Sequence, residues 1–347
     1  MTTDRTLALV ESPAQLLNVL ELAHREDAPA DVPIAVLAPS AGPTRTQLRS
    51  MVQLAREAGH AVSWHEPRLG GAAVARTVRA LSSELNGVEQ LIVGDPFSGV
   101  IQVIVTVSRA SEVTIVDDGT ATLEFVRQWV AGEHLSRWHQ RATPNQRRHI
   151  ATLARDQIAG SARRRLSPAL GCRLRLFSCL SVNLPGVVVV PNQFTWTRAS
   201  FGPPQIKASA DLVGTSLVET GVVRAEHYLA GVESLVAGNG VDRYFAHRKE
   251  AGWKLDLIAR MGVEVVRPLL PLEIVARRGP VGRRMLSFPS TVVHTLPLVL
   301  AGSGVELEVC AIPDDWYCAD VTPRADAFLH EVTDTARQNF GLAAVAC

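Results

Sequence analysis

Two adjacent carboxylates, Asp117 and Asp118, follow an apolar run at residues 113–116 and precede Gly119. Like charges this close raise one of the two pKa values, so the pair can supply a general base that deprotonates a hydroxyl group. Gly119 lets the chain turn sharply after the carboxylates. The same residues also fit an Asp-Gly turn that caps the following helix. The segment by itself leaves both interpretations open.

A histidine, His247, stands at the end of a second predicted strand, residues 242–246, and is followed by Arg248 and Lys249. An imidazole followed by two cations is suited to form a hydrogen bond with a phosphate oxygen or to protonate it. The alternative is a surface histidine in a basic loop. None of the ten histidines pairs with another histidine or a cysteine at metal-ligand spacing, so we expect no metal site.

Hydroxyl groups gather where a strand at residues 285–288 meets a helix at 292–300: Pro289 is followed by Ser290 and Thr291. A helix that begins this way presents free N–H groups and a dipole that bind anions, to which the hydroxyls add hydrogen bonds. Simple helix capping is the alternative. Gly214-Thr215-Ser216, after residues 210–213, is a weaker version of the same arrangement.

These groups all stand where predicted strands end. Short β-branched runs alternate with helical patterns of 10 to 15 residues, which is typical of βαβ units and a mostly parallel sheet. Ligands bind beyond the carboxyl ends of such strands. We expect strands at 7–10, 33–37, 61–64, 90–93, 113–116, 187–190, 210–213, 242–246, 263–266, 285–288 and 305–311. We expect helices at 14–24, 44–58, 72–85, 224–236, 249–261, 270–275, 292–300 and 325–340.

A basic segment interrupts the alternation between residues 133 and 175. It carries ten arginines against one acid, Asp156, after Glu133. A solvated helical connector explains this pattern, as does a basic face for an anionic acceptor or an anionic membrane surface. The spacing does not decide between the two.

Composition excludes several classes of protein. A chain of 347 residues predicts two domains, and 47% hydrophobic with 20% charged residues excludes disorder. A net charge of +1 gives no reason to expect a nucleic-acid partner. Five scattered cysteines favour a reducing compartment, and no apolar run fits a signal peptide or a membrane span. We expect a cytoplasmic protein, with peripheral contact at the inner membrane face left open.

Taken together and in this order, the three groups resemble motifs of the bacterial sialyltransferases, including the polysialyltransferase and lipooligosaccharide sialyltransferase families. Those families carry an acidic-acidic-Gly motif, a His-Pro motif and a paired Ser/Thr motif. The segment Ser12-Pro13-Ala14-Gln15 is similar to their N-terminal Ser-Pro-x-Gln segment. The motifs are short, and their common order and spacing carry the resemblance.

The resemblance implies a GT-B architecture, that is, an α/β fold of two Rossmann-like domains facing across a cleft. We expect an acceptor-side domain at 1–180, which includes the basic connector, and a CMP-binding domain at 181–347. The resemblance also implies inverting, metal-independent transfer of sialic acid or a related nonulosonate from a CMP-activated donor to a glycan acceptor, without a cofactor.

The resemblance further assigns roles. One acid of the Asp117-Asp118 pair deprotonates the acceptor hydroxyl, with a weak preference for Asp117. His247 stabilises or protonates the departing CMP phosphate, which Ser290 and Thr291 hold. The remaining expected substrate-binding residues are Gly119, Ser12, Gln15, Gly214, Thr215 and Arg248.

One departure from the family pattern supports an alternative function. Arg248 stands where the family's histidine is usually followed by proline. A non-catalytic protein that binds a nucleotide sugar or an anionic glycan would tolerate this change, although such a protein has no need of the acidic pair. A Rossmann-type oxidoreductase is excluded, because Glu11-Ser12-Pro13 follows the first strand in place of a G-x-G-x-x-G loop.

Overall fold

The computed structural model describes residues 5–25, 32–40, 42–69, 72–136, 146–318 and 323–346. The chain forms two compact units, residues 1–192 and 193–347. The division falls later than the expected boundary at 180/181. The reason is that β7 (Val188–Pro191), which we expected to begin the second domain, pairs with β6 (Arg173–Ser178) in the first sheet.

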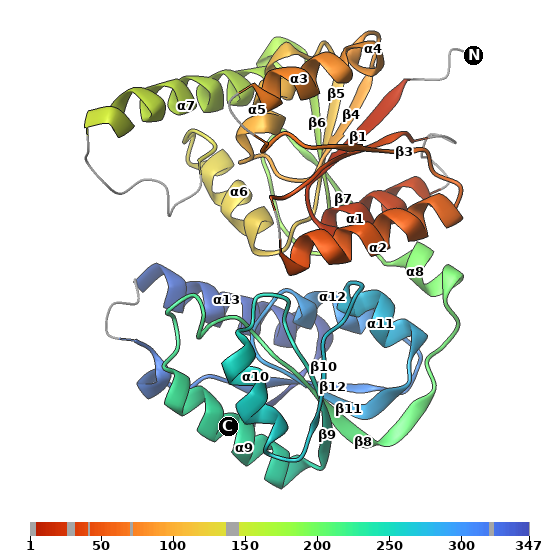
Figure 1. The fold of residues 1–347 in the computed structure, drawn as a ribbon, viewed down its shortest axis with the longest axis vertical. Helices are drawn as coiled ribbons and strands as arrows, with labels where there is room; N and C mark the ends of the chain where they lie inside the picture. The colour runs from red at the N-terminus through yellow and green to blue at the C-terminus, as the bar shows by residue number, and fades with distance from the viewer. Residues whose placement is uncertain are drawn as a thin grey trace. The chain divides into compact units, whose positions relative to one another are not determined.

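The first unit contains a seven-stranded parallel sheet in the order β3-β2-β1-β4-β5-β6-β7 (Figure 1). Its central strands are buried on both faces, as continuous β-branched and leucine runs predict for a parallel sheet. The other strands are β1 (Thr6–Val10), β2 (Ile34–Leu37), β3 (Val62–His65), β4 (Gln90–Val93) and β5 (Glu112–Val116).

Helices cover both faces of this sheet. Figure 1 shows α1 and α2 on one side and α5 and α7 on the other. The core on the α5 side joins alternate residues of the strands, such as Leu7 and Leu9, to Ile101, Ile104 and Phe125. The helices are α1 (Pro13–Ala23), α2 (Pro43–Glu57), α3 (Ala73–Ala80), α4 (Ser82–Leu85), α5 (Gly99–Val107), α6 (Thr120–Val130) and α7 (Gln146–Arg165).

The second unit contains a six-stranded parallel sheet in the order β10-β9-β8-β11-β12-β13. Its core includes Tyr228, Tyr244, Phe288 and Trp316. The strands are β8 (Ile206–Val213), β9 (Val241–Phe245), β10 (Glu264–Val266), β11 (Val281–Ser287), β12 (Glu306–Ala311) and β13 (Ala343–Ala346). The helices are α8 (Thr195–Ser200), α9 (Ala225–Asn239), α10 (Gly252–Ala259), α11 (Leu272–Arg278), α12 (Val292–Val299) and α13 (Pro323–Phe340).

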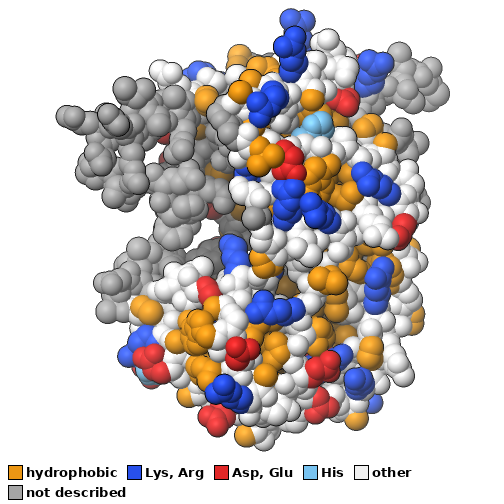
Figure 2. Space-filling model, viewed as in Figure 1, with side chains coloured by type: hydrophobic (Ala, Val, Ile, Leu, Met, Phe, Trp, Pro, Cys, Tyr) orange, Lys and Arg blue, Asp and Glu red, His pale blue; other side chains and the backbone are white. Residues whose placement is uncertain are grey.

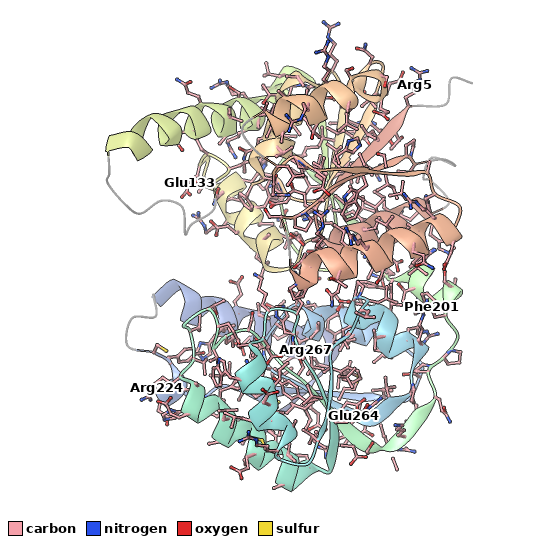
Figure 3. All side chains as sticks on the ribbon, in the orientation of Figure 1. Arg5, Glu133, Phe201, Arg224, Glu264 and Arg267 are labelled. Carbon is pink, nitrogen blue, oxygen red and sulfur yellow. The ribbon has the colours of Figure 1, made fainter. Side chains whose placement is uncertain are left out.

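In each sheet the order in which the chain adds its strands reverses at one place. The strand order switches between β1 and β4 in the first sheet and between β8 and β11 in the second. In open parallel sheets a crevice forms at this point, outside the carboxyl ends of the strands. In Figure 3, Glu264 marks the beginning of β10 and Arg267 follows its end, so Arg267 locates the carboxyl edge of the second sheet. The predicted α/β class of two parallel sheets is confirmed.

The basic segment is partly built into the first unit. Residues 137–145 lie outside the described part; of the rest, residues 146–165 form α7 and residues 173–175 begin β6. Arg163 stacks over Trp129, and Arg165 donates to the carbonyl groups of Ser108 and Ala110. Arg164 remains exposed and contacts Ser161. Two of the three consecutive arginines therefore serve packing, and a membrane-binding role for the segment stays a prediction.

The surface mixes charges of both signs. On the face that Figure 2 shows, Lys and Arg side chains are interspersed with Asp and Glu, in keeping with the net charge of +1. No described helix is long and apolar enough to cross a bilayer. The absence of a nucleic-acid partner and the cytoplasmic location stay predictions.

Candidate functional site

Asp117 is enclosed at the end of β5, with 2% of its surface exposed. Its Oδ1 accepts hydrogen bonds from the Gly119 N–H at 2.8 Å and the Thr122 hydroxyl at 2.6 Å. Its Oδ2 accepts from the Ser178 hydroxyl at 2.6 Å and the Cys179 N–H at 3.3 Å. Both oxygens are thus occupied, and the carboxylate ties the end of β5 to that of β6. The surroundings of Asp117 therefore fit a structural role, which is to hold the ends of β5 and β6 together.

Asp118 lies beside it and is half-buried. Its Oδ1 accepts from the Ser12 hydroxyl at 3.0 Å, and its Oδ2 accepts from the Gln15 side-chain amide at 2.9 Å. Ser12 and Gln15 thus orient the carboxylate from the beginning of α1, about a hundred residues away in sequence. The structure brings the Ser-Pro-x-Gln segment and the acidic pair together at one edge of the first sheet.

Gln15 is itself fixed in place. Its Oε1 accepts from the Glu11 N–H at 2.7 Å, and Gly94 packs so closely against it that a Cβ there would overlap the amide. Ser12 also caps α1 by accepting from the Gln15 N–H at 3.2 Å. The two residues that hold Asp118 are therefore preorganised by the loops after β1 and β4, at the switch point of the sheet.

A buried carboxylate, Glu11, stands at the same switch point with 7% of its surface exposed. It accepts from Arg68 at 2.8 Å and from the Ser98 hydroxyl at 2.9 Å. Burial raises the pKa of Glu11, and Arg68 acts in the opposite direction. Glu11 is absent from the predicted site, although an acid directly after a buried apolar strand is a signal that the sequence carries.

In the second unit His247 follows β9 in a turn over residues 247–250, closed by a Glu250 N–H to His247 carbonyl bond of 3.0 Å. The ring Nδ1 accepts from the Lys249 N–H at 3.3 Å, so the neutral ring carries its proton on Nε2. Burial, together with the cations Arg248, Lys249 and Lys254, lowers the pKa of His247 from 6.5 to about 3. A half-buried, neutral imidazole with an Nε2–H donor results.

Gly214 and Thr215 follow the neighbouring strand β8 and are buried. A Cβ at Gly214 would overlap the Tyr244 hydroxyl and the Glu250 carboxylate, so glycine permits this close approach. The Thr215 carbonyl accepts from Lys254 Nζ at 2.9 Å. The Gly-Thr segment is thereby fixed to the elements that hold His247.

Ser290 and Thr291 follow β11, which pairs with β8 on the side opposite β9. Both residues are half-buried where α12 begins. Neither hydroxyl makes a hydrogen bond to a described residue. Their carbonyls accept from the Val293 and His294 N–H groups, respectively. The pair sits across the switch point from Gly214-Thr215.

The structure thus groups the predicted residues within each unit. Ser12, Gln15, Asp117, Asp118 and Gly119 gather at the edge of the first sheet, and the remaining residues follow three adjacent strands of the second: Gly214, Thr215, His247, Arg248, Ser290 and Thr291. The cleft expected between the domains stays a prediction. Within the described ranges no group of three or more His, Cys, Asp or Glu side chains is arranged to hold a metal ion.

A buried network behind His247 was missed at the sequence level. It consists of two tyrosines, two glutamates and a lysine: Tyr228, Tyr244, Glu219, Glu250 and Lys254. Glu250 lies three residues after His247, which is the spacing of a helix capping pair, so a signal was present. Lys254 gave none, because nothing in its local sequence distinguishes a buried lysine from a solvated one.

Comparison with solved structures identifies the architecture. An α/β-galactoside α-2,3-sialyltransferase of the marine bacterium Photobacterium phosphoreum superposes with a TM-score of 0.52 at 13% identity, over 98% of this chain and 97% of the other. A UDP-N-acetylglucosamine 2-epimerase, assigned as putative, from Listeria monocytogenes gives a TM-score of 0.54 at 9% identity, over 99% and 92%. The chain has the GT-B fold.

No protein-family model and no curated protein matches this sequence. The similarity is therefore one of fold, which is shared by a sugar transferase and a sugar epimerase. Function must be argued from the residues at the two sheet edges.

Proposed function

We propose that the protein is an inverting glycosyltransferase that moves sialic acid or a related nonulosonate from a CMP-activated donor to a hydroxyl group of a glycan. The observation that carries the proposal is the grouping at the switch point of the second sheet. There an Nε2–H donor follows β9, and two hydroxyls and the beginning of α12 follow β11, with β8 between these two strands. All of these groups donate hydrogen bonds, as the phosphate of a nucleotide sugar requires.

On the acceptor side we assign the base to Asp118, in place of the initially preferred Asp117. The Asp117 carboxylate is buried and each of its oxygens accepts two hydrogen bonds from the protein, so a substrate hydroxyl cannot reach it. Asp118 is half-buried, and its two hydrogen bonds fix its orientation. In the proposed reaction the acceptor proton passes to Asp118 while the acceptor oxygen forms a bond to the anomeric carbon.

On the donor side the bond between the anomeric carbon and the phosphate oxygen breaks, and its electron pair stays on the phosphate of CMP. The neutral His247 donates a hydrogen bond from Nε2 to that phosphate and stabilises the developing charge. Its low pKa favours this role over proton transfer. Ser290 and Thr291 supply further donors, and Gly214 lets the main chain after β8 approach the Tyr244 hydroxyl and the Glu250 carboxylate that lie behind His247.

The test is release of CMP from CMP-sialic acid by the purified chain, with lactose as the galactoside acceptor. We expect release that increases with acceptor and is unchanged by a chelator, because the donors named above replace a metal ion. UDP-N-acetylglucosamine is the matched control donor and should not be turned over. Inhibition of CMP release by the chelator would contradict the metal-free mechanism.

The alternative is a protein that binds the nucleotide sugar without turnover. It predicts thermal stabilisation by CMP, on the order of 2–3 kcal/mol at about 100 times Kd, with no CMP release under any condition. The oriented carboxylate of Asp118 favours the transferase, because binding alone has no use for a base.

A further inference from the structure

The turn that carries His247 contains a reciprocal pair of hydrogen bonds between side chains and main chain. The His247 Nδ1 accepts from the Lys249 N–H at 3.3 Å, and the Glu250 carboxylate accepts from the His247 N–H at 2.6 Å. This pattern is related to a capping box, with histidine in the place of serine or threonine and with its ring accepting from the second residue after it instead of the third. The pair fixes both the main chain and the ring of His247.

Glu250 is held in turn by buried partners and is 4% exposed. It accepts from the Tyr244 hydroxyl at 2.5 Å and pairs with Lys254 Nζ at 2.8 Å. Burial raises the pKa of Glu250, and Lys254 is the largest opposing influence. The ion pair therefore keeps the carboxylate able to accept from the His247 N–H.

Lys254 is fully buried and links His247 to the neighbouring loop. Its Nζ donates to the Thr215 carbonyl at 2.9 Å and to Glu219 at 3.1 Å, and it lies over the ring of Tyr228 at 4.5 Å. Glu219 accepts from the Ala251 N–H at 2.9 Å, which closes the connection. One buried lysine thus bonds to the loop after β8 and, through Glu250, to the turn after β9.

We propose that Glu250 and Lys254 are positioning residues, which hold His247 as its Nε2-protonated tautomer and keep it in register with the Thr215 loop; their catalytic consequence rests on the proposed function. Arg248 occupies the second position of the turn, where proline would restrict the main chain. Here the Glu250 side chain supplies that restriction. The charged and titratable groups acting on the ring are Arg248, Lys249, Glu250 and Lys254.

The experiment compares His247 in the full chain with that in Glu250→Ala, by nitrogen-15 NMR of the histidine rings, assigned with His247→Gln. In the native chain we expect the Nε2–H tautomer at neutral pH and a pKa of about 3. In Glu250→Ala the turn opens, so we expect a mixture of tautomers and a pKa at least about one unit closer to 6.5. An unchanged tautomer and titration would overturn the proposal.

Two further variants keep the test decisive if Glu250→Ala does not fold. Glu250→Gln keeps an oxygen that accepts from the His247 N–H, so we expect it to preserve the tautomer. Lys254→Met removes the cation and the bond to Thr215, so we expect the pKa of His247 to rise. The opposite ranking, with Glu250→Gln losing the tautomer and Lys254→Met leaving the pKa unchanged, contradicts the positioning role. Glu308→Gln, which breaks the Arg284–Glu308 pair on β11 and β12, is the control and should leave His247 unchanged.

Activity separates this inference from the proposed function. We expect Glu250→Ala to lower kcat about 10- to 100-fold, the scale of a small misplacement of a reacting group, with little change in the acceptor KM. Altered NMR of His247 in a chain without transferase activity would refute the function and leave the positioning role. Transferase activity with unaltered NMR would refute the positioning role alone.

Discussion

The carboxyl edges of the two sheets share one strand topology and differ in where they carry charged groups. In the first unit the proposed base is the half-buried carboxylate of Asp118, and the residues that orient it are neutral, Ser12 and Gln15. In the second unit the proposed phosphate ligand is the neutral imidazole of His247, and the residues behind it, Glu250 and Lys254, are a buried ion pair. An acceptor base must stay ionised and reachable, whereas a phosphate ligand needs a rigid donor.

Glycine performs the same task at both edges. Gly94 leaves room for Gln15, and Gly214 leaves room for Tyr244. In each case the side chain that packs on the glycine holds a member of the site through a hydrogen bond, directly to Asp118 or through Glu250 to His247. The switch point of each sheet thus includes one position that a larger residue would disrupt.

The largest expected effect distinguishes the two adjacent acids. Asp118→Asn should lower the rate of CMP release with acceptor by roughly 10²- to 10⁴-fold, because the base is lost, while CMP still stabilises the protein. Asp117→Asn should instead lower the free energy of unfolding by about 2–3 kcal/mol, because the donors around it lose their charged acceptor. Denaturant unfolding and initial rates measure the two quantities. The reverse pattern would return the base to Asp117.

His247→Ala should reduce turnover by roughly 10²- to 10³-fold, the scale for removing one hydrogen-bond donor that stabilises developing negative charge. A near-native rate would remove His247 from the mechanism. His247→Gln, which keeps a side-chain N–H donor, should retain more activity than alanine.

The low pKa of His247 also predicts how the stability of the folded chain depends on pH. Its pKa is about 3 in the folded chain, and unfolding restores a value near 6.5, so the unfolded state binds more protons below pH 6.5. The contribution of His247 to stability is therefore complete above pH 6.5 and is lost as the pH falls toward 3. His247→Gln should lose stability less steeply than the native chain over this range in thermal melts. Equal slopes would place the ring in a solvated environment.

Gly94→Ala and Gly214→Ala test the parallel between the two edges. Each introduces a methyl group where the packed side chain leaves no space, and each should cost about 1–3 kcal/mol of unfolding free energy. Activity should fall in both, through Asp118 in the first and His247 in the second. Gly202→Ala is the matched control, because Gly202, like Gly94 and Gly214, has no positive φ, and its Cβ would meet nothing within 4 Å.

The smallest effects concern the basic segment. Arg165→Gln should lower the unfolding free energy by about 1 kcal/mol, since it loses its bonds to two carbonyl groups, whereas Arg164→Gln should stay within about 0.5 kcal/mol. Neutralising all three of Arg163, Arg164 and Arg165 should leave the acceptor KM and recovery with anionic vesicles unchanged if the segment serves packing. A higher acceptor KM or a lower recovery with anionic vesicles would establish that the segment binds an anionic acceptor or membrane surface.

Most of the element pattern was predictable because buried parallel strands are continuous apolar runs. The strands at 90–93 and 113–116 and the helix at 44–58 match β4, β5 and α2 within one residue. Helix α5 was not predicted, and α6 was considered only as the helix that the Asp-Gly turn would cap. Both helices follow strand ends, Gly94-Asp95 and Asp117-Asp118, whose residues were interpreted as turns or as candidate catalytic groups. β6 was hidden in the arginine-rich segment, because Arg173 and Arg175 on its exposed side pair with Glu112 of β5.

The sequence by itself determined the fold class and the list of candidate groups, because both depend on local order: apolar period, strand ends and short motifs. Tertiary structure decided which acid is reachable and what stands behind the histidine. Adjacent residues such as Asp117 and Asp118 have nearly the same local sequence, yet the neighbours that bury one and orient the other come from β6 and α1. Burial and hydrogen bonding between distant segments set accessibility and pKa, and no local pattern encodes them.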